Sequence, residues 1–528
     1  MNLRTRIRDE ETGFAIVIAV ALIALLSTMA VALPLLIRNE DSKSRRDVAQ
    51  DGAYQAAEAG TNATLSDLTQ STAFFKKYMA KGEATRTYNS TNYSNDCVTG
   101  STSTTQSTCS DKDVSATTFN SPWWTYATSA SARASDTGWY SLGNGYQYLI
   151  QLNPPNTSLS GLASTITRID VTGRPYGSTD VSQWRTIETM IRPSSLTDFQ
   201  AFVATSLAYG SGATTTGPVF VGEDNAGNTY NLDHAGTAKA NLYAEGQVDY
   251  QRGTPSAYTN FQNGATYFDS TTNPNALCKL NNCAPVPFSS FSSTFSKVAG
   301  AAPAPWNLGT TDGSGNTVDA WWISFTSDGK ASIKACTKYY TTDSHGNKTY
   351  YPIYDNQPNC AAYLASTPLP TNGAIYSAAD VIVSGVVKGQ ITVATPGNVY
   401  YGGSLTQATP GTDVIGEEAQ GNIYVPEWAP DSNRNITIYS AQFSLNGAFE
   451  SSPDWSGSTK GTMNFYGSTA VYGITPCSTS KGADCTIIYF SGFFTTRNYN
   501  YDPNLLFVQP PYWPTLGNAF TILVQRQI

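Results

Sequence analysis

Acidic side chains gather in one short segment of this 528-residue sequence. The segment holds Asp413, Glu417, Glu418, Glu427 and Asp431. Two carboxyl groups held near each other can cleave a glycosidic bond, one as the acid and the other as the base or nucleophile. Acidic residues are also common on solvated loops. We favour this second interpretation because no other catalytic pattern accompanies the segment.

The two histidines do not complete a catalytic pattern. His345 lies in a predicted turn, and His234 follows Asp233 without a nucleophile elbow of the type GxSxG. The sequence therefore predicts that the chain is not an enzyme, and it indicates no cofactor.

The eight cysteines are spaced for disulfide bonds. They form close pairs along the chain: Cys97 with Cys109, Cys278 with Cys283, Cys336 with Cys360, and Cys477 with Cys485. An even number with local spacing is typical of disulfide-closed loops in an oxidising compartment. A zinc site is the alternative, but CxxC spacing and clustered histidines are both missing. We expect four disulfides, no metal, and most of the chain outside the cytoplasm.

Three segments with similar residues suggest calcium loops at first sight. They are Asp224–Asn228, Asp312–Asn316 and Asp343–Asn347. The bidentate acidic ligand that ends a true calcium loop is missing from each. Asx-Gly turns at hairpin tips explain the same residues, and we predict such turns.

Aromatic residues offer a surface for binding. Tyr and Trp total 42, and the doublets Trp123-Trp124 and Trp321-Trp322 should each place at least one ring away from a strand's core face. Exposed rings can stack on sugars, bases or partner surfaces, although burial of both rings in a bent loop is the alternative. The net charge of −8 and the lack of a basic run after Lys43, Arg45 and Arg46 disfavour nucleic acid. A carbohydrate, surface or DNA ligand stays open.

The elements that position these residues begin with an apolar run. Phe14 to Ile37 contains no charge over 24 positions, enough for a helix to span a hydrocarbon core of ~30 Å. Residues 38–70 are also compatible with helix, so we predict one helix over 14–70 with a transmembrane half at 14–37. A stripe of small residues on its exported half should let a backbone or sheet approach closely: Ala49, Ala53, Ala56, Gly60 and Ala63.

Two short motifs carry a family resemblance. Gly13, Phe14 and the apolar run Ala15–Ala19, with Gln55–Gly60 further on, resemble the N-terminus of PilX-type members of the type IV pilin family. The resemblance covers about the first 65 residues. It implies a leader at residues 1–13, cleavage after Gly13 by a prepilin peptidase, and methylation of Phe14. It also implies other pilins and the inner-membrane assembly platform as partners.

One departure from this family indicates a position in the filament. Shaft pilins carry a glutamate at the fifth mature position, where this chain has Ile18. The resemblance therefore implies a low-copy or tip subunit. Such a subunit is single-pass in the inner or cytoplasmic membrane before assembly, with its bulk outside, and later lies on the pilus or cell surface.

The rest of the chain is predicted to be mostly strand. Charged residues are 13% of the sequence, and 43 Gly with 27 Pro suit short strands joined by turns. Strand-like runs at 146–152, 166–172 and 184–191 predict a pilin-like head with an antiparallel sheet over residues 71–195. Recurring glycine-bounded phrases such as Gly397–Gly402 and Gly461–Gly467 then predict a β-solenoid-like domain over 196–528, with an insertion at about 250–370 and a cap at about 474–528. A Greek-key sandwich is the competing fold.

These observations lead to an α+β, mainly β, fold class and to a minor pilin-like function. The chain would prime filament assembly or display an adhesive β-domain. One alternative is a membrane-anchored surface-binding protein outside any filament. Another is a pilus-tip DNA receptor, because Tyr499–Pro503 and Pro510–Pro514 resemble the ending of large PilX-type surface proteins, a group that includes a competence pilin.

Overall fold

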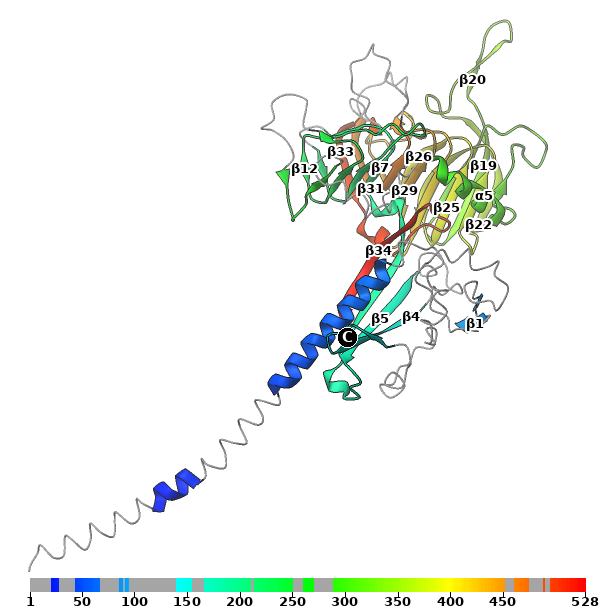
Figure 1. Ribbon diagram of the computed structural model, residues 1–528. Helices are drawn as coiled ribbons and strands as arrows, with labels where there is room; N and C mark the ends of the chain where they lie inside the picture. The colour runs from blue at the N-terminus through cyan, green and yellow to red at the C-terminus, as the bar shows by residue number, and fades with distance from the viewer. Residues whose placement is uncertain are drawn as a thin grey trace, which may run out of the picture.

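The computed structural model of the chain describes residues 20–27, 43–66, 85–88, 91–94, 139–153, 166–209, 213–249, 260–269, 288–451, 460–473, 488–489 and 494–528. The described part is mainly β, in agreement with the sequence. A helix and a small sheet lie toward one end, and a larger body of strands lies at the other (Figure 1). The short strands β1 (Thr85–Tyr88) and β2 (Thr91–Ser94) pair with each other.

The small sheet, which we call the head sheet, is antiparallel and five-stranded in the order β3-β4-β5-β6-β34. Its strands are β3 (Tyr140–Ser141), β4 (Tyr146–Asn153), β5 (Thr167–Pro175), β6 (Arg185–Ser195) and β34 (Thr515–Gln527). β4, β5 and β6 overlap the three predicted strand-like runs. The structure places β34 beside β6, whereas the sequence analysis assigned these residues to the cap of the second domain.

Helical residues 43–66, which we call the docked helix, lie along the head sheet (Figure 1). The segment contains no proline and is rich in alanine, so nothing in it interrupts a helix. Its side chains alternate between exposed positions and a buried face every three or four residues. This amphipathic pattern turns one face toward the sheet.

The prediction of one long helix over residues 14–70 is wrong for the described residues. Helix is present at 20–27 and again at 43–66, and residues 14–19, 28–42 and 67–70 lie outside the described part. Within the described ranges, no helix is both long enough and apolar enough to cross a membrane. The docked helix buries one face, whereas all side chains of residues 20–27 are exposed.

After β6 the chain enters the large body through η3 (Leu196–Asp198) and forms parallel stacks. The first stack contains β7 (Ala201–Val203), β10 (Val219–Val221), β13 (Leu242–Ala244) and β16 (Tyr267–Phe268). The second contains β8 (Leu207–Tyr209), β11 (Leu232–His234) and β14 (Val248–Asp249). The third contains β9 (Thr214–Thr215), β12 (Thr237–Ala238) and β15 (Asn260–Phe261).

The chain then continues through η5 (Phe288–Ser292) and α5 (Ser293–Ala301) to the far end of the body. From there it winds back through a second run of parallel strands. One ladder contains β17 (Asn307–Leu308), β23 (Ala374–Ser377), β25 (Gln390–Thr395), β27 (Val414–Ala419), β29 (Ile436–Ser444), β31 (Lys460–Val471) and β33 (Phe494–Tyr501). The other contains β18 (Ala320–Thr326), β24 (Asp380–Val387), β26 (Val399–Gln407), β28 (Ile423–Val425), β30 (Phe449–Ser451) and β32 (Ile488–Tyr489).

The two runs meet in the middle of the stack. β31 pairs in parallel with β7, the strand that follows directly after the head. The coils are therefore not stacked in sequence order, because the chain leaves from the middle toward one end and returns from the other end. The pairing between coils is parallel throughout the described ladders, as in a β-solenoid, whereas a Greek key is built from antiparallel strands.

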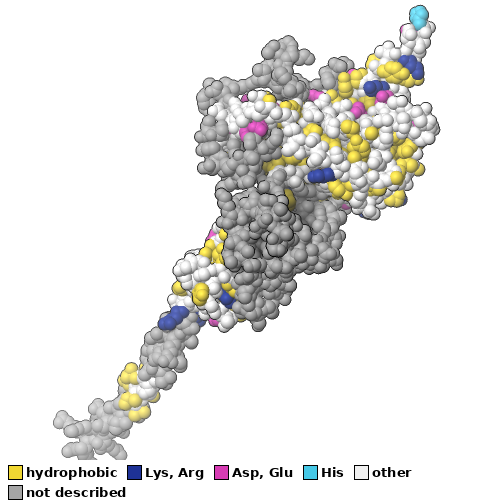
Figure 2. Space-filling model, turned by 45° about the vertical axis from the view of Figure 1, so that its right-hand side comes forward, with side chains coloured by type: hydrophobic (Ala, Val, Ile, Leu, Met, Phe, Trp, Pro, Cys, Tyr) yellow, Lys and Arg dark blue, Asp and Glu magenta, His cyan; other side chains and the backbone are white. Residues whose placement is uncertain are grey.

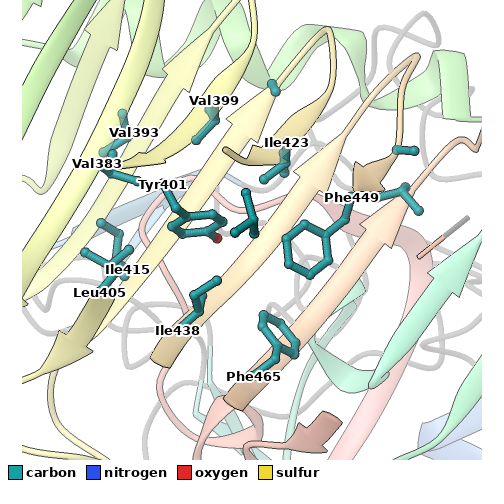
Figure 3. Close-up of a cluster of buried hydrophobic side chains, with 14 of the residues drawn as sticks. Val383, Val393, Val399, Tyr401, Leu405, Ile415, Ile423, Ile438, Phe449 and Phe465 are labelled. Atoms are coloured by element: carbon teal, nitrogen blue, oxygen red, sulfur yellow. The ribbon is translucent and has the colours of Figure 1, made fainter. Parts of the chain in front are cut away.

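Alternating side chains of these strands fill one continuous core (Figure 3). In β26, Val399, Tyr401 and Leu405 are buried, and they lie among Val383, Ile423 and Phe449 of neighbouring coils. Gly385 forms a corner of β24 with φ of 105°, and a Cβ there would lie 2.1 Å from the carbonyl oxygen of Phe325. Gly385 therefore allows neighbouring coils to approach closely at this corner.

An insertion departs from the parallel pattern. β18 pairs antiparallel with β19 (Lys330–Thr337), which pairs with β22 (Asn359–Pro368). Between β19 and β22 lies a separate hairpin of β20 (Tyr340–Thr342) and β21 (Lys348–Tyr350). The remaining short helices are η2 (Val181–Gln183) and η7 (Pro503–Leu506).

Candidate functional site

The docked helix contacts the head sheet through small side chains. Ala53, Ala56 and Gly60 of the predicted stripe are buried, Ala49 is half-buried and Ala63 is exposed. Opposite them, a Cβ at Gly173 of β5 would lie 1.8 Å from the carbonyl oxygen of Ala53. Helix and strand backbones therefore approach as closely as the predicted stripe implied.

The buried face also includes residues that the sequence analysis missed. Ala57, Thr61 and Thr64 are fully buried. The Thr61 hydroxyl donates to the carbonyl oxygen of Ala57 at 2.9 Å, and the Thr64 hydroxyl donates to that of Gly60 at 2.7 Å. Threonine can bury its methyl group because these bonds satisfy its hydroxyl. Continuing the steps of three and four from Ala53 would have found both threonines.

The head and the solenoid are joined by two adjacent connections, which we call the neck. One leads from β6 into η3, and the other from η7 into β34. Arg192 of β6 is fully buried, forms an ion pair with Asp198 of η3, and donates from Nε to the carbonyl oxygen of Leu506 at 3.1 Å. Thr521 of β34 donates to the same aspartate at 2.5 Å. One buried ion pair thus contacts both connections.

A second ionic group attaches the C-terminal strand to the head. Glu188 of β6 is 2% exposed and accepts from Arg526 of β34 at 2.8 Å. Arg168 of β5 forms an ion pair with the same carboxylate, also at 2.8 Å. Burial, together with Glu188, raises the pKa of neighbouring Asp170 to about 7. β34 is therefore bonded to the head by side chains as well as by the sheet ladder.

The acidic segment does not form a solvated loop as a whole. Glu417 and Glu418 lie in β27 and are fully buried. Tyr401 donates to Glu417 at 3.3 Å, and Gln442 donates to the Tyr401 hydroxyl oxygen at 2.5 Å. Burial raises the pKa of Glu417 well above its ordinary value and the pKa of Glu418 to about 8. Carboxyl groups in this position lack the solvent access that a hydrolytic site needs.

The other acids of this segment have different environments. Asp413 accepts from the backbone N–H groups of Gly389 and Thr409 at 2.8 and 2.7 Å. Asp431 accepts from those of Asn433 and Asn435, and Glu427 is half-buried. The structure therefore does not bring the five predicted acids together at one solvent-accessible centre.

The two histidines lie in unrelated places. His234 is buried inside the solenoid, where its Nε2 lies 3.1 Å from the Thr215 hydroxyl and its Nδ1 accepts from the Gly236 N–H at 3.2 Å. Burial lowers the pKa of His234 to about 4, so it is neutral at physiological pH. His345 lies at the tip of the β20–β21 hairpin.

The three aspartate segments form the predicted turns. The Asp312 carboxylate accepts from the N–H groups of Ser314 and Asn316, both at 2.8 Å, and from the Asn316 side chain at 2.9 Å. Asp224 and Asp343 repeat the arrangement. These hydrogen bonds lower the pKa of Asp312, and the bond from the Asn316 side chain has the largest effect. N–H donors therefore surround each carboxylate in the described geometry.

The Trp321-Trp322 doublet divides between the two faces of β18. Trp321 is 1% exposed and its indole N–H donates to the carbonyl oxygen of Gly309 at 2.6 Å. Trp322 is half-buried on the outer face, where it donates to the Ser384 hydroxyl at 3.0 Å and contacts Trp428. Trp123 and Trp124 lie outside the described residues.

The structure joins Cys336 to Cys360 in a disulfide across β19 and β22. The other six cysteines, Cys97, Cys109, Cys278, Cys283, Cys477 and Cys485, lie outside the described residues, as do Gly13 and Phe14. Sequence reasoning also missed the tyrosine doublets of the β20–β21 hairpin. Their equal distance from the Asp343 turn was a usable signal for a hairpin with paired rings.

Comparison with known proteins gives limited information. No protein-family model matches the chain, and no curated protein matches it. Among solved structures, the chain is similar to the competence-associated pilin ComZ from Thermus thermophilus, with 12% identity over 91% of this chain and 97% of that one. The TM-score is 0.26, too low to establish a shared fold.

Proposed function

We propose that this chain is a minor pilin-like subunit that displays its β-solenoid outside the cell. The neck is the observation that supports this proposal. Because both connections pass side by side through β6 and β34, the head holds the solenoid at two points, and the buried pair of Arg192 with Asp198 limits movement between them. Such an arrangement suits a small head that holds a large solenoid surface outside the cell.

The proposal includes the processing that the N-terminal motif implies. A prepilin peptidase would cut after Gly13, Phe14 would be methylated, and other pilins and an inner-membrane assembly platform would be the partners. The role would be to prime filament assembly or to present an adhesive surface. We propose no catalysis, since the most suggestive carboxyl groups, Glu417 and Glu418, are fully buried.

Mass spectrometry of the N-terminus tests this function. The membrane-extracted protein is isolated from cells with and without their prepilin peptidase. We expect methylated Phe14 only when the peptidase is present. An intact Met1, or a cut at an unrelated position in both strains, would reject the pilin-like function in favour of an anchored surface protein that joins no filament. The net charge of −8 does not favour the remaining alternative, a DNA receptor at the pilus tip.

A further inference from the structure

The hairpin of β20 and β21 projects from the solenoid as a separate finger, which we define as residues 337–359 (Figure 1). His345 lies at its exposed tip, and Figure 2 shows the molecule narrowing to a projection at this end. The Cys336–Cys360 disulfide closes its base, and the Lys338 N–H donates to Asp319 at 2.8 Å just above it. The finger is thus fixed at its base, where Ile353 is buried, and residues 341–350 toward its tip are exposed to solvent.

Both faces of the finger carry a pair of tyrosines. Tyr340 and Tyr350 lie directly opposite each other in the ladder, with ring centroids 5.5 Å apart. Tyr339 and Tyr351 form the second pair at 5.8 Å, and the Tyr351 hydroxyl lies 3.3 Å from that of Thr341. Tyr339 is 37% exposed and Tyr350 is 57% exposed. Cross-strand aromatic pairs stabilise a ribbon modestly, and rings exposed to this extent are also accessible to a ligand.

The tyrosine pairs of the finger are tilted, whereas two tyrosine pairs of the solenoid are stacked. Tyr439 stacks on Tyr466 at an interplanar angle of 13°, and Tyr400 stacks on Tyr424 at 14°. Such parallel stacks cover ring faces with other rings. The finger pairs are tilted by 52° and 42° instead, which leaves ring faces open, although the Lys348 ammonium lies 4.1 Å from the centre of the Tyr340 ring.

The remaining side chains of the ribbon define the chemistry of a ligand. Residues 338–351 contain no Leu, Ile, Val, Met or Phe, and hydroxyl, amide and backbone groups surround the rings. Lys338 and Lys348 against Asp343 leave a net charge of only +1 with histidine neutral. Because residues 338–351 have no large aliphatic side chains, the ribbon cannot supply the apolar centre of a typical protein interface. Without a cationic cluster it is poorly suited to a polyanion.

We propose that the finger binds a neutral, linear glycan, with sugar rings packed on the faces of the tyrosine pairs. A pyranose ring has C–H faces that suit an aromatic ring and hydroxyls that suit the neighbouring Thr341 and tyrosine oxygens. The 5.5 and 5.8 Å separations are comparable with the length of one sugar unit, so two rings can contact successive sugars. This inference rests on the proposed display function, for which it names the class of ligand.

Titration calorimetry with cellohexaose tests the inference. The protein is the whole chain as extracted from the membrane in detergent. The wild type should bind this neutral glucan. The double variants Y339T with Y351T, and Y340T with Y350T, keep strand-forming residues but remove the rings of one face each. At least one of them should bind at least about tenfold more weakly, as expected for the loss of aromatic stacking.

Y176T is the matched control, because Tyr176 is 68% exposed on the head and far from the finger in sequence. Its affinity for cellohexaose should equal that of the wild type. The inference would be overturned by a wild type that does not bind cellohexaose, by equal binding in all variants, or by binding only to an anionic heparin hexasaccharide. The state of Phe14 is measured independently, so failure of glycan binding can be told apart from failure of the pilin-like function.

Discussion

Two single residues occupy positions with strict packing requirements. Gly173 faces the docked helix where a side chain has no room, and Glu418 is a carboxyl side chain fully buried in the solenoid. Both residues look unremarkable in the sequence, since neither a glycine in a strand nor a glutamate beside another glutamate signals its environment. Each leads to a prediction about stability.

Gly173→Ala should destabilise the head by about 2 kcal/mol or more, because the added methyl would lie 1.8 Å from the Ala53 carbonyl oxygen and force the helix away. Hydrogen exchange of residues 43–66 should report faster opening. Gly300→Ala is the control, since space is open around that helical glycine and alanine favours helix. Unchanged exchange in Gly173→Ala would contradict the observed helix–sheet contact.

Glu418 should make stability fall as pH rises. Burial raises its pKa from 4.5 to about 8, so the folded state keeps a proton that the unfolded state releases between these values. The contribution of this protonation to the free energy of unfolding is present in full below about pH 4.5 and is lost as pH increases to about 8. It amounts to at most about 5 kcal/mol. Denaturant unfolding between pH 4.5 and 8 should show that the free energy of unfolding changes less with pH in Glu418→Gln than in wild type. Glu58→Gln, on the exposed face of the docked helix, is the control, and equal slopes in all three proteins would reject the argument.

At the scale of elements, corners of the solenoid are joined by a ladder of polar side chains. Asp380 accepts from the Asn398 N–H at 2.8 Å, and Asn398 accepts from the Asn422 N–H at 2.9 Å. Asn422 then accepts from the Ala448 N–H at 2.8 Å. Each coil thereby satisfies a backbone donor of the next, which helps to set the register between coils.

Asn422→Ala should reduce the free energy of unfolding by about 1–3 kcal/mol, because the Ala448 N–H loses its acceptor at a partly buried corner. Chemical denaturation of the full chain measures this change. Asn446→Ala removes an exposed side chain of the same type from a neighbouring loop and should have almost no effect. Equal effects of the two substitutions would show that the ladder does not contribute to stability.

At the scale of the whole molecule, the neck couples the head and the solenoid. The chain leaves the head after β6 and returns more than 300 residues later as β34, next to the strand it left. Head and solenoid therefore share their boundary at the neck, where Arg192 and Asp198 are buried together. Removing Arg192 would leave the Asp198 carboxylate without a cationic partner.

Arg192→Leu should destabilise the protein by about 3–5 kcal/mol and expose the neck, because the nearly buried Asp198 carboxylate would lose its cationic partner. Limited proteolysis should then cut near residues 196–198 or 503–509 before it cuts the solenoid. Lys330→Ala breaks the exposed pair with Asp328 and should cost less than about 1 kcal/mol. An Arg192→Leu protein as stable and protease-resistant as Lys330→Ala would show that the ion pair does not hold the neck.

Local patterns were enough to predict several parts of this protein. Alternation of side chains predicted β4, β5 and β6, and the Asp-Gly-Asn segments predicted three turns. Small residues at helical spacing predicted the buried contact of Ala53, Ala56 and Gly60. These properties depend on neighbours in the sequence, whose geometry is set by backbone dihedrals and hydrogen bonds over a few residues.

Only the tertiary structure decided how the parts combine. The pairing of β34 with β6, the meeting of β31 with β7 and the burial of Glu417 and Glu418 all depend on segments far apart in the chain. The prediction of one long helix over residues 14–70 is wrong for the described residues, where helix is present at 20–27 and at 43–66. The sequence by itself indicated β4, β5, β6 and the three aspartate turns, whereas long-range burial decided the order of the coils and which polar groups lie inside.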